Sequence, residues 1–427
     1  MKLVDFRRNF LNPTMSISYS PAPFVIARSE GQYLFDENGN KFLDCINNVS
    51  HIGHCHPKYI KNIQEQLPVL NTNARFLFDG LKEATEKLLR LFPKELRVVT
   101  WACSGSEAND LALQMAKIHS GRNQLYCLAD AYHGHTDITM LVSPYKWNEH
   151  FRRSKDVTVL DTPCTYRGAY RRKENSSQLY AEKFTKKIDS KKGIAGFIYE
   201  PMQSCAGQIV PKDDYYKEMG RVVHEHGGVI IADEVQTGFG RLGKNFWAFE
   251  HYGIVPDIVT VGKALGNGFP VSAVICRKEI AESFHKYGIE YASSYAGNPL
   301  SNAAVSAVID VIHDQKLQEN AREVGDYVKQ GFIKLMKFNH VGDVRGHGFF
   351  LGIDIVKNKR SREPFKELAI NIRQAAREEG VLISVDGVNK NVIKFKPPMV
   401  FTKENADQLL DTLNRVIPKV LRQMNLQ

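Results

Sequence analysis

The sequence predicts an α/β protein with a large domain on a mostly parallel central sheet and a smaller α+β domain. Between about residues 58 and 308, short β-rich runs alternate with helical patterns, which is typical of parallel strands joined by helices. From residue 309 onward a helix, strands and two further helices follow. A chain of 427 residues is long enough for both domains.

The elements are expected in the following order. Residues 1–57 form an N-terminal arm and a hairpin that joins the small domain, and Asn38-Gly39 marks the hairpin's tight turn. Residues 58–308 form the large domain, and residues 309–427 form the small one. The β-rich runs of the large domain are 98–101, 124–128, 157–160, 196–200, 229–233, 258–261 and 271–276. Helical segments include 107–118, 214–226, 367–379 and a final helix from Lys403.

Composition and charge exclude several classes of protein. Hydrophobic residues make up 43% and charged residues 24%, as in ordinary globular proteins. No apolar run approaches the ~18 residues that a membrane helix needs. Seven scattered cysteines without a Cys-x-x-Cys pair favour a reducing compartment. The net charge of +10 is spread over short runs without a recognition motif. We therefore expect no nucleic-acid or membrane partner, but attraction for anionic substrates.

Two interpretations are open for the first twenty residues. Lys2, Arg7 and Arg8 stand against one acid, Asp5, and several serines follow. This composition is compatible with a mitochondrial presequence. It is equally compatible with an ordered arm of a cytoplasmic protein.

Lys263 is the most informative residue of the chain. It lies between the β-rich run 258–261 and a glycine turn, and lysine is seldom buried without a partner. A desolvated lysine amine loses its proton readily and can form a Schiff base with a carbonyl. An earlier strand pattern ends in Asp233 and Glu234. A Schiff-base lysine and an acid for a pyridinium nitrogen are the minimum for pyridoxal phosphate chemistry.

The two acids are expected to have different roles. Neighbouring strand side chains point to opposite faces, so only one acid can meet the ring nitrogen. We assign Asp233 to it and expect Glu234 to anchor the following loop. Gln236 is placed to hydrogen-bond the ring hydroxyl.

Two further segments suit the same cofactor. Gly105 and Ser106 follow a strand and open a helix, so backbone N–H groups there can bind a phosphate. Tyr132 follows another strand, where its ring can stack on a flat cofactor. A capped turn and a packing tyrosine are common, so each signal is weak by itself.

Together these segments resemble the class III aminotransferase family, of fold type I. The family pattern is Gly-Ser-Glu-Ala-Asn, Tyr-His-Gly, Glu-Pro, Asp-Glu-Val-Gln-x-Gly-x-Gly-Arg-x-Gly, the lysine, and a hydroxyl before Gly-Asn-Pro. The chain matches it at Gly105–Asn109, Tyr132–Gly134, Glu200-Pro201, Asp233–Gly243, Lys263 and Ser294–Pro299. The ordered set covers nearly the whole chain and is highly specific.

The resemblance implies pyridoxal 5'-phosphate (PLP) as cofactor, with Lys263 and Asp233 as the catalytic residues. The implied cofactor-binding set is Gly105, Ser106, Tyr132, Glu200, Asp233, Gln236, Lys263 and Ser294. Ser294 would reach the cofactor phosphate of the other subunit, which implies a homodimer, or a dimer of dimers. Threonine is the usual residue at that position. The family resemblance also favours a mitochondrial location.

Two other patterns are not interpreted as sites. Residues 238–244 fit Gly-x4-Gly-Lys, but Asn245 replaces the Ser or Thr that a P-loop needs. His51, His54 and His56 could suggest a metal site. The family has Gly-His-x-His-Pro at this place, which implies a structural role, so no metal is expected.

The chain departs from many ω-aminotransferases of the family at the substrate side. Those enzymes bind a carboxylate through an arginine in Arg-Phe-x-Pro-Pro, gated by a glutamate in Gln-Gly-Glu-x-Gly. Here Lys394 replaces the arginine and Cys205 replaces the glutamate. We expect a net positive local charge without a planar fork, which suits a tetrahedral phosphate.

These departures resemble the ethanolamine-phosphate and 5-phosphohydroxy-L-lysine phospho-lyase branch, in older naming "alanine–glyoxylate aminotransferase 2-like". Segments 47–57, 70–76, 143–146, 165–171 and 202–208 agree with it, and the last looks closest to the ethanolamine-phosphate member. The implied reaction converts O-phosphoethanolamine to acetaldehyde, ammonia and phosphate, with Lys263 as general base. An ω-aminotransferase of the alanine–glyoxylate type and a 5-phosphohydroxy-L-lysine phospho-lyase are the alternatives.

The substrate phosphate needs basic groups. The candidate residues for this phosphate site are Lys394, Arg75, Arg167 and Cys205. For the two arginines, a structural salt bridge is an equal alternative.

Overall fold

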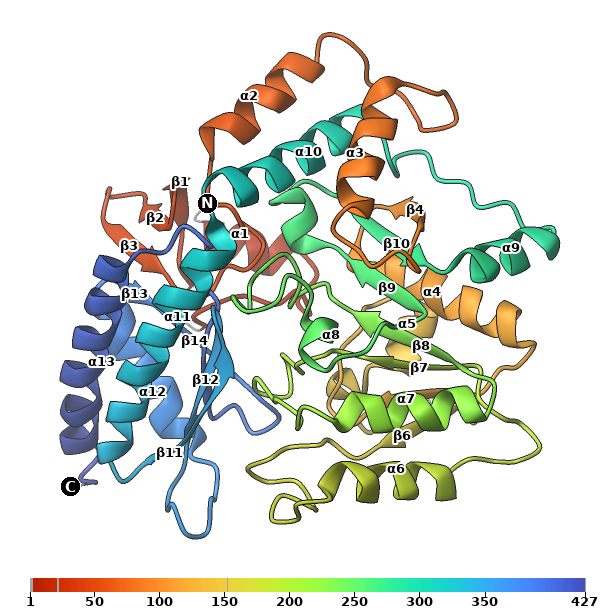
Figure 1. Cartoon of the computed structure of the whole chain (residues 1–427). Coiled ribbons are helices and arrows are strands. Elements are labelled where there is room, and N and C mark those ends of the chain that lie inside the picture. Colours follow the sequence, from red (N-terminus) through yellow and green to blue (C-terminus); the bar gives the residue numbers. More distant parts are fainter. Residues whose placement is uncertain (1–2, 21–22, 152, 427) are drawn as a thin grey trace.

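The computed structural model describes residues 3–20, 23–151 and 153–426 (Figure 1). Its largest sheet has seven strands in the order β4-β10-β9-β8-β7-β5-β6. They are β4 (Val98–Ala102), β5 (Leu125–Leu128), β6 (Val157–Leu160), β7 (Gly196–Tyr199), β8 (Val229–Asp233), β9 (Ile258–Val261) and β10 (Ser272–Cys276). Only β10 runs antiparallel to its neighbours, so the prediction of a mostly parallel sheet is confirmed.

Helices cover both faces of this sheet because its strands are apolar on both sides. Side chains alternate along β8: Ile230 and Ala232 join one hydrophobic core, and Val229 and Ile231 join the other. The first core contains α6 and α7, and the second contains α4 and α9 (Figure 1). The helices of this region are α2 (Pro57–Gln66), α3 (Asp79–Leu89), α4 (Gly105–Ser120), α5 (Asp137–Leu141), α6 (Ser176–Lys186), α7 (Tyr215–Glu225), α8 (Ala248–His251), α9 (Lys278–Lys286) and α10 (Pro299–Asp314).

Two smaller sheets lie beside the large one. One has the order β1-β2-β3-β13 and the other β11-β12-β15-β14. Their strands are β1 (Ile26–Glu30), β2 (Tyr33–Asp36), β3 (Lys41–Asp44), β11 (Val341–His347), β12 (Phe350–Ile355), β13 (Val381–Leu382), β14 (Ser384–Asp386) and β15 (Val392–Phe395). The helices beside them are α11 (Leu317–Lys334), α12 (Lys366–Glu378) and α13 (Lys403–Gln423).

The N-terminal hairpin forms where it was predicted. β2 and β3 pair antiparallel, and Gly39, at φ +81°, donates its N–H to the carbonyl of Asp36. β3 also pairs in parallel with β13, so this early segment contacts the C-terminal part of the chain. Helix α10 crosses the predicted boundary between residues 308 and 309, and the three-part division stays a prediction.

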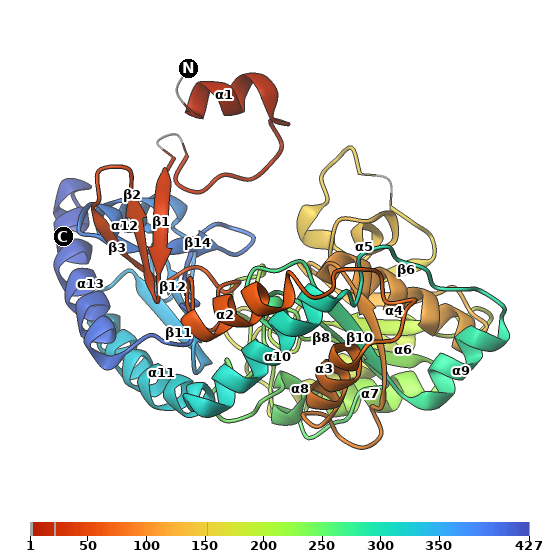
Figure 2. The same cartoon turned by 90° about the horizontal axis from the view of Figure 1, so that it is seen from above.

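The N-terminal helix α1 (Leu3–Phe10) stands apart from the rest of the molecule and has no buried residue (Figure 2). Among the described helices, none is long and apolar enough to cross a membrane.

Candidate active site

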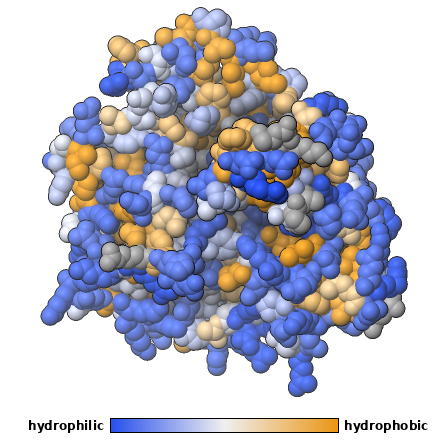
Figure 3. Space-filling view, turned by 180° about the vertical axis from the view of Figure 1, so that it is seen from behind, coloured by the Kyte–Doolittle hydropathy of each residue, from blue (hydrophilic) through white to orange (hydrophobic). Residues whose placement is uncertain are grey.

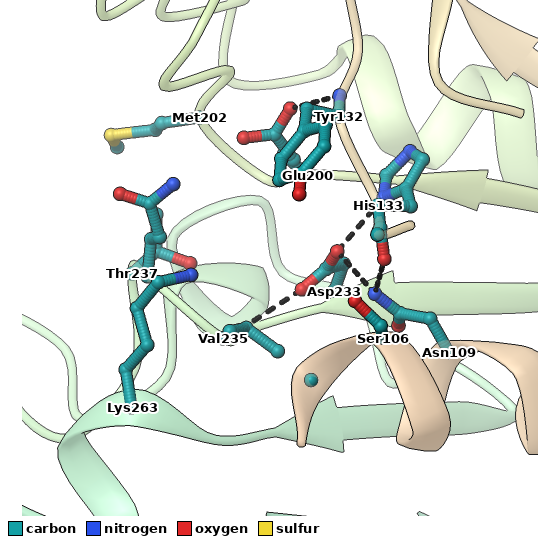
Figure 4. Close-up of a pocket in the computed structure, with 13 residues that line it drawn as sticks. Ser106, Asn109, Tyr132, His133, Glu200, Met202, Asp233, Val235, Thr237 and Lys263 are labelled. Carbon is teal, nitrogen blue, oxygen red and sulfur yellow. Dashed lines mark hydrogen bonds and ion pairs between the residues drawn. The ribbon is translucent and has the colours of Figure 1, made fainter. Parts of the chain in front are cut away.

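A cavity of about 220 Å³ lies where α4 begins and where β8 and β9 end (Figure 4). Ligands of α/β sheets gather at the carboxyl ends of parallel strands, so this is the expected place for a site. The cavity is lined by Gly105, Ser106, Asn109, Tyr132, His133, Gly134, Glu200, Met202, Asp233, Val235, Gln236, Thr237 and Lys263. Of the eight residues expected at the cofactor, only Ser294 is missing from this lining.

Lys263 begins the short helix η2 (Lys263–Gly266), directly after β9, and extends its side chain toward the cavity (Figure 4). Its φ of +38° lies in the left-handed region, which is unfavourable for a residue with a Cβ and is often found at functional sites. Burial lowers the pKa of its amine, and the charge of Asp233 partly opposes that effect. The amine therefore loses its proton more readily than a surface lysine does.

Asp233 ends β8 and is fixed in orientation by three donors. One carboxylate oxygen accepts hydrogen bonds from His133 Nδ1 and Asn109 Nδ2, both at 2.8 Å. The other oxygen accepts one from the backbone N–H of Val235 at 3.1 Å. Thr260 in turn donates to Asn109 Oδ1 at 2.6 Å. The carboxylate thus faces the cavity in one defined position (Figure 4).

Glu234 points away from the cavity, as expected. Its carboxylate accepts hydrogen bonds from Thr237 Oγ1 at 2.6 Å and from the Phe249 N–H at 2.8 Å. Burial raises its pKa to about 8. The acid therefore anchors the loop that follows β8.

The opposite end of the cavity is suited to an anion. Ser104 caps α4 by accepting a hydrogen bond from the Glu107 N–H, while the N–H groups of the first helical turn have no intrahelical partner. A Cβ on Gly105 would lie 2.9 Å from Val235 Cγ1, and a Cβ on Gly134 would lie 2.7 Å from Ser106 Oγ. Only glycine leaves this space open, and the space suits a phosphate.

Glu200 lies at the end of β7 and supports the wall of the cavity. Its carboxylate accepts hydrogen bonds from the backbone N–H of Tyr132 at 3.2 Å and of Ser204 at 3.0 Å. Burial raises its pKa to about 7. Through these bonds Glu200 fixes the segment that carries the Tyr132 ring.

A second cavity, of about 440 Å³, shares Gln236 and Lys263 with the first. Gln236 Oε1 accepts hydrogen bonds from three groups: Asn48 Nδ2 at 2.8 Å, Ser204 Oγ at 3.0 Å and Lys396 Nζ at 2.6 Å. This arrangement leaves the amide nitrogen of Gln236 as the donor for a ligand in the first cavity.

Lys394 and Cys205 both line the second cavity. Lys394 does not have a free charge there, because its amine is 2.5 Å from an oxygen of Asp386 on the neighbouring strand β14. Burial opposes the ionisation of Asp386, but Lys394 outweighs it and holds the pKa of Asp386 below its usual value. Burial raises the pKa of Cys205 to about 12. Lys394 therefore has an acidic partner, Asp386, although Cys205 replaces the gating glutamate of the family.

Arg167 does not lie at either cavity. Its guanidinium pairs with the buried Asp354, which also pairs with Arg345, and it donates to the carbonyl of Arg362. The salt-bridge alternative therefore describes Arg167 correctly, because its charge is already satisfied inside the fold.

Arg75 and Ser294 lie at the surface of the chain rather than in the cavities. Arg75 is exposed, and its Nε donates to Asn73 Oδ1 at 3.2 Å. Ser294 is also exposed, and it lines a surface hollow together with residues 71–73. Neither residue reaches Lys263 of the same chain.

Several site residues received no role from the sequence. Asn109 and His133 hold Asp233, although both belong to the motifs that were recognised. Lys396 lies two residues after Lys394, and this spacing places both lysines on one face of an extended segment. The spacing is the feature of the sequence from which Lys396 could have been predicted as a site residue. His51 bonds the carbonyl of Phe239, and His54 bonds Asp44.

Comparison with known proteins identifies the family of this chain. The sequence profile described as "Aminotransferase class-III" matches residues 14–417. The chain belongs to this family. Within the family, it is 41% identical to a Drosophila melanogaster protein named "Alanine--glyoxylate aminotransferase 2-like", over 98% of this chain and 87% of that protein. It is 40% identical to the Caenorhabditis elegans "Ethanolamine-phosphate phospho-lyase homolog 1", over 97% and 93%.

Solved structures of the family agree in fold. A phospholyase from Arthrobacter in complex with phosphoethanolamine matches with a TM-score of 0.91 and 32% identity, covering 98% of this chain and 99% of that one. An amine transaminase from an uncultivated Pseudomonas species, in the PLP-bound form, matches with a TM-score of 0.89 and 28% identity, covering 96% and 99%. The class III family uses PLP, and this chain is a PLP-dependent enzyme of that family.

Proposed function

We propose that this enzyme is a phospho-lyase that eliminates phosphate from a phosphorylated primary amine, with O-phosphoethanolamine as its substrate. One observation carries the proposal. The cavity beside Lys263 presents two lysines, Lys394 and Lys396, where carboxylate-binding relatives are expected to have an arginine gated by a glutamate. Phosphoethanolamine in the Arthrobacter phospholyase, which covers 98% of this chain, supports the same substrate class.

The first cavity has the groups that PLP requires. The N–H groups at Gly105 and Ser106 would bind its phosphate, Tyr132 would lie against its ring, and Gln236 would donate to its hydroxyl. Asp233 would keep the ring nitrogen protonated. When bound, PLP supplies an aldehyde for the substrate amine and a ring that accepts electrons.

Lys263 would carry the proton transfer. Its amine, already shifted toward the neutral form by burial, removes a proton from the carbon next to the substrate nitrogen. The bond between the adjacent carbon and the phosphate oxygen then breaks, and its electron pair leaves with the phosphate. Hydrolysis of the remaining two-carbon unit gives acetaldehyde and ammonia, so no oxidant or amino acceptor is consumed.

The test is phosphate release by the PLP-loaded enzyme from two substrates, O-phosphoethanolamine and 5-phosphohydroxy-L-lysine. We expect the first to give the higher kcat/KM, and Lys263→Ala to abolish release. Phosphate release from 5-phosphohydroxy-L-lysine alone would identify that compound, rather than O-phosphoethanolamine, as the substrate. No release from either, together with transfer of the amino group from alanine to glyoxylate, would establish a transaminase instead.

We also propose a homodimer in which Ser294 of one subunit completes the cofactor site of the other. Ser294, Tyr295 and residues 71–73 line one surface hollow. Tyr295 is 74% exposed, and Leu77, which follows residues 71–73 in the sequence, is 93% exposed. Hydrophobic residues also lie along the edge where α2 and the loop to α3 are found (Figure 3). Such a surface favours a second copy of the chain.

We further propose a mitochondrial location for the enzyme. The support is the N-terminal segment, where α1 contains Arg7 and Arg8 against one acid and buries no side chain. Basic amphipathic segments of this kind are typical of mitochondrial presequences. Import of a reporter fused to residues 1–20 into isolated mitochondria would test this location, and a reporter left outside would contradict it.

A further inference from the structure

Lys396 is a buried lysine that has no acidic partner among the described residues. It follows β15, and only 2% of the residue is exposed. Its Nζ donates to Ser204 Oγ at 2.8 Å and to Gln236 Oε1 at 2.6 Å. Both acceptors are neutral. Across the described residues 3–20, 23–151 and 153–426, no carboxylate forms an ion pair with it.

Such a position is costly for an ammonium group. A buried charge without a counter-charge destabilises a folded protein. Burial, and after it the neighbouring Lys394, lower the pKa of Lys396 well below its usual value. An anion bound beside this amine would favour its charged form again. A destabilising residue in the wall of a cavity is a candidate for ligand binding.

Lys394 differs in its electrostatic situation. Its amine pairs with Asp386, which also accepts a hydrogen bond from Tyr145 at 2.9 Å and lies 3.9 Å from the exposed amine of Lys390. An anion in the second cavity therefore meets an ion-paired amine at Lys394 and, among the described residues, an amine without an ion pair at Lys396. An ammonium has three donors. Two of those of Lys396 are in use, so the third remains for a phosphate oxygen.

We propose that Lys396, rather than Lys394, is the principal cation that binds the phosphate group of the substrate. The inference rests on the proposed phospho-lyase function and names the residue responsible for it. Lys396 contacts Gln236, which lines both cavities, so the phosphate is held beside Lys263. When the carbon–oxygen bond breaks, its electron pair stays on the phosphate, and the ammonium of Lys396 compensates the added negative charge.

The test is calorimetric titration of the PLP-loaded enzyme with inorganic phosphate. Lys396→Met keeps the length of the side chain and removes its charge. We expect phosphate affinity to fall by about ten- to a hundred-fold, the usual loss for one charge-assisted contact. The pyridoxal absorbance should be kept and Tm should not decrease, because an apolar side chain replaces an unpaired buried charge.

Two further variants serve as comparisons. Lys394→Met combined with Asp386→Asn removes both members of the closest ion pair, while the exposed Lys390 keeps its amine near Tyr145. This double variant should weaken phosphate binding by less than about three-fold. Lys357→Met removes an exposed lysine that pairs with Glu363 and should leave binding unchanged.

Three outcomes would overturn the inference. Unchanged phosphate affinity in Lys396→Met, in an enzyme that still releases phosphate from phosphoethanolamine, would disprove the role of Lys396 and leave the phospho-lyase function in place. A joint loss of Tm, pyridoxal absorbance and phosphate affinity would show a structural role. A wild-type enzyme that neither binds nor releases phosphate would overturn the proposed function itself.

Discussion

Lys263 and Asp233 reach the cavity from the ends of neighbouring strands, β9 and β8. Local structure fixes the position of each side chain. Lys263 has a left-handed backbone conformation. The carboxylate of Asp233 accepts hydrogen bonds from His133, Asn109 and the Val235 N–H. A preorganised acid and a desolvated amine are the two groups that PLP chemistry needs from the protein. Both were identified from the sequence because their signals are local.

A substitution of Arg167 tests whether the charge of this residue stabilises the fold or binds the substrate. Arg167→Met should lower the free energy of unfolding by about 1–3 kcal/mol, because Asp354 loses one of its two arginine partners. The kcat/KM for phosphoethanolamine should stay unchanged. Urea unfolding and steady-state kinetics measure the two quantities. A ten-fold loss of kcat/KM with unaltered stability would return Arg167 to the phosphate site.

Charge partners across strands could not be predicted from the sequence. Lys394 was recognised as a departure from the family pattern, but its partner Asp386 lies on β14, and only the pairing of β14 with β15 brings them together. The contacts of Lys396 with Ser204 and Gln236 were not predictable for the same reason, because both partners come from distant parts of the chain. Its spacing from Lys394 indicated only that the two lysines share a face. Local pattern carries no information about such contacts.

At the scale of elements, the beginning of α4 is the part that positions the cofactor phosphate. Gly105→Ala would place a Cβ 2.9 Å from Val235 Cγ1, and the first turn must shift to relieve this contact. We expect PLP affinity to fall by at least about ten-fold, through loss of a charge-assisted N–H contact. Spectroscopic titration of the apoenzyme with PLP measures it.

Gly80→Ala is the matched control, since a Cβ there makes only ordinary contacts of 3.6 Å with Phe78 at the start of α3. It should leave PLP affinity unchanged. Wild-type affinity in Gly105→Ala would show that the start of α4 does not hold the cofactor.

The strands of the large sheet were predictable because they are apolar runs between helices. All seven β-rich runs form strands β4 to β10, with ends that differ by at most one residue. The pairing of β3 with β13 was not predictable strand by strand, because β13 has only two residues. Short strands contain too few residues to show a periodic pattern.

At the scale of the whole molecule, the proposed dimer explains why Ser294 and Arg75 lie outside the cavities of their own chain. Leu77→Asp, on a side chain that is 93% exposed, should break the dimer, because a charge would be buried at the interface. The resulting monomer should lose PLP. Sedimentation velocity and pyridoxal absorbance measure both effects.

Ile333→Asp on α11, where Ile333 is 40% exposed, is the control and should remain dimeric with PLP bound. A Leu77→Asp monomer that retains PLP and full activity would rule out a shared site.

The central claim is that each catalytic cycle eliminates phosphate and releases the amino group as ammonia, rather than transferring the amino group to a keto acid. The most direct measurement is the yield of phosphate and ammonia from phosphoethanolamine in the absence of any keto acid. The phospho-lyase account predicts equal amounts of both products over many turnovers, with the pyridoxal absorbance of the enzyme maintained throughout. Turnover that stops after one equivalent and resumes only when pyruvate or glyoxylate is added would contradict it.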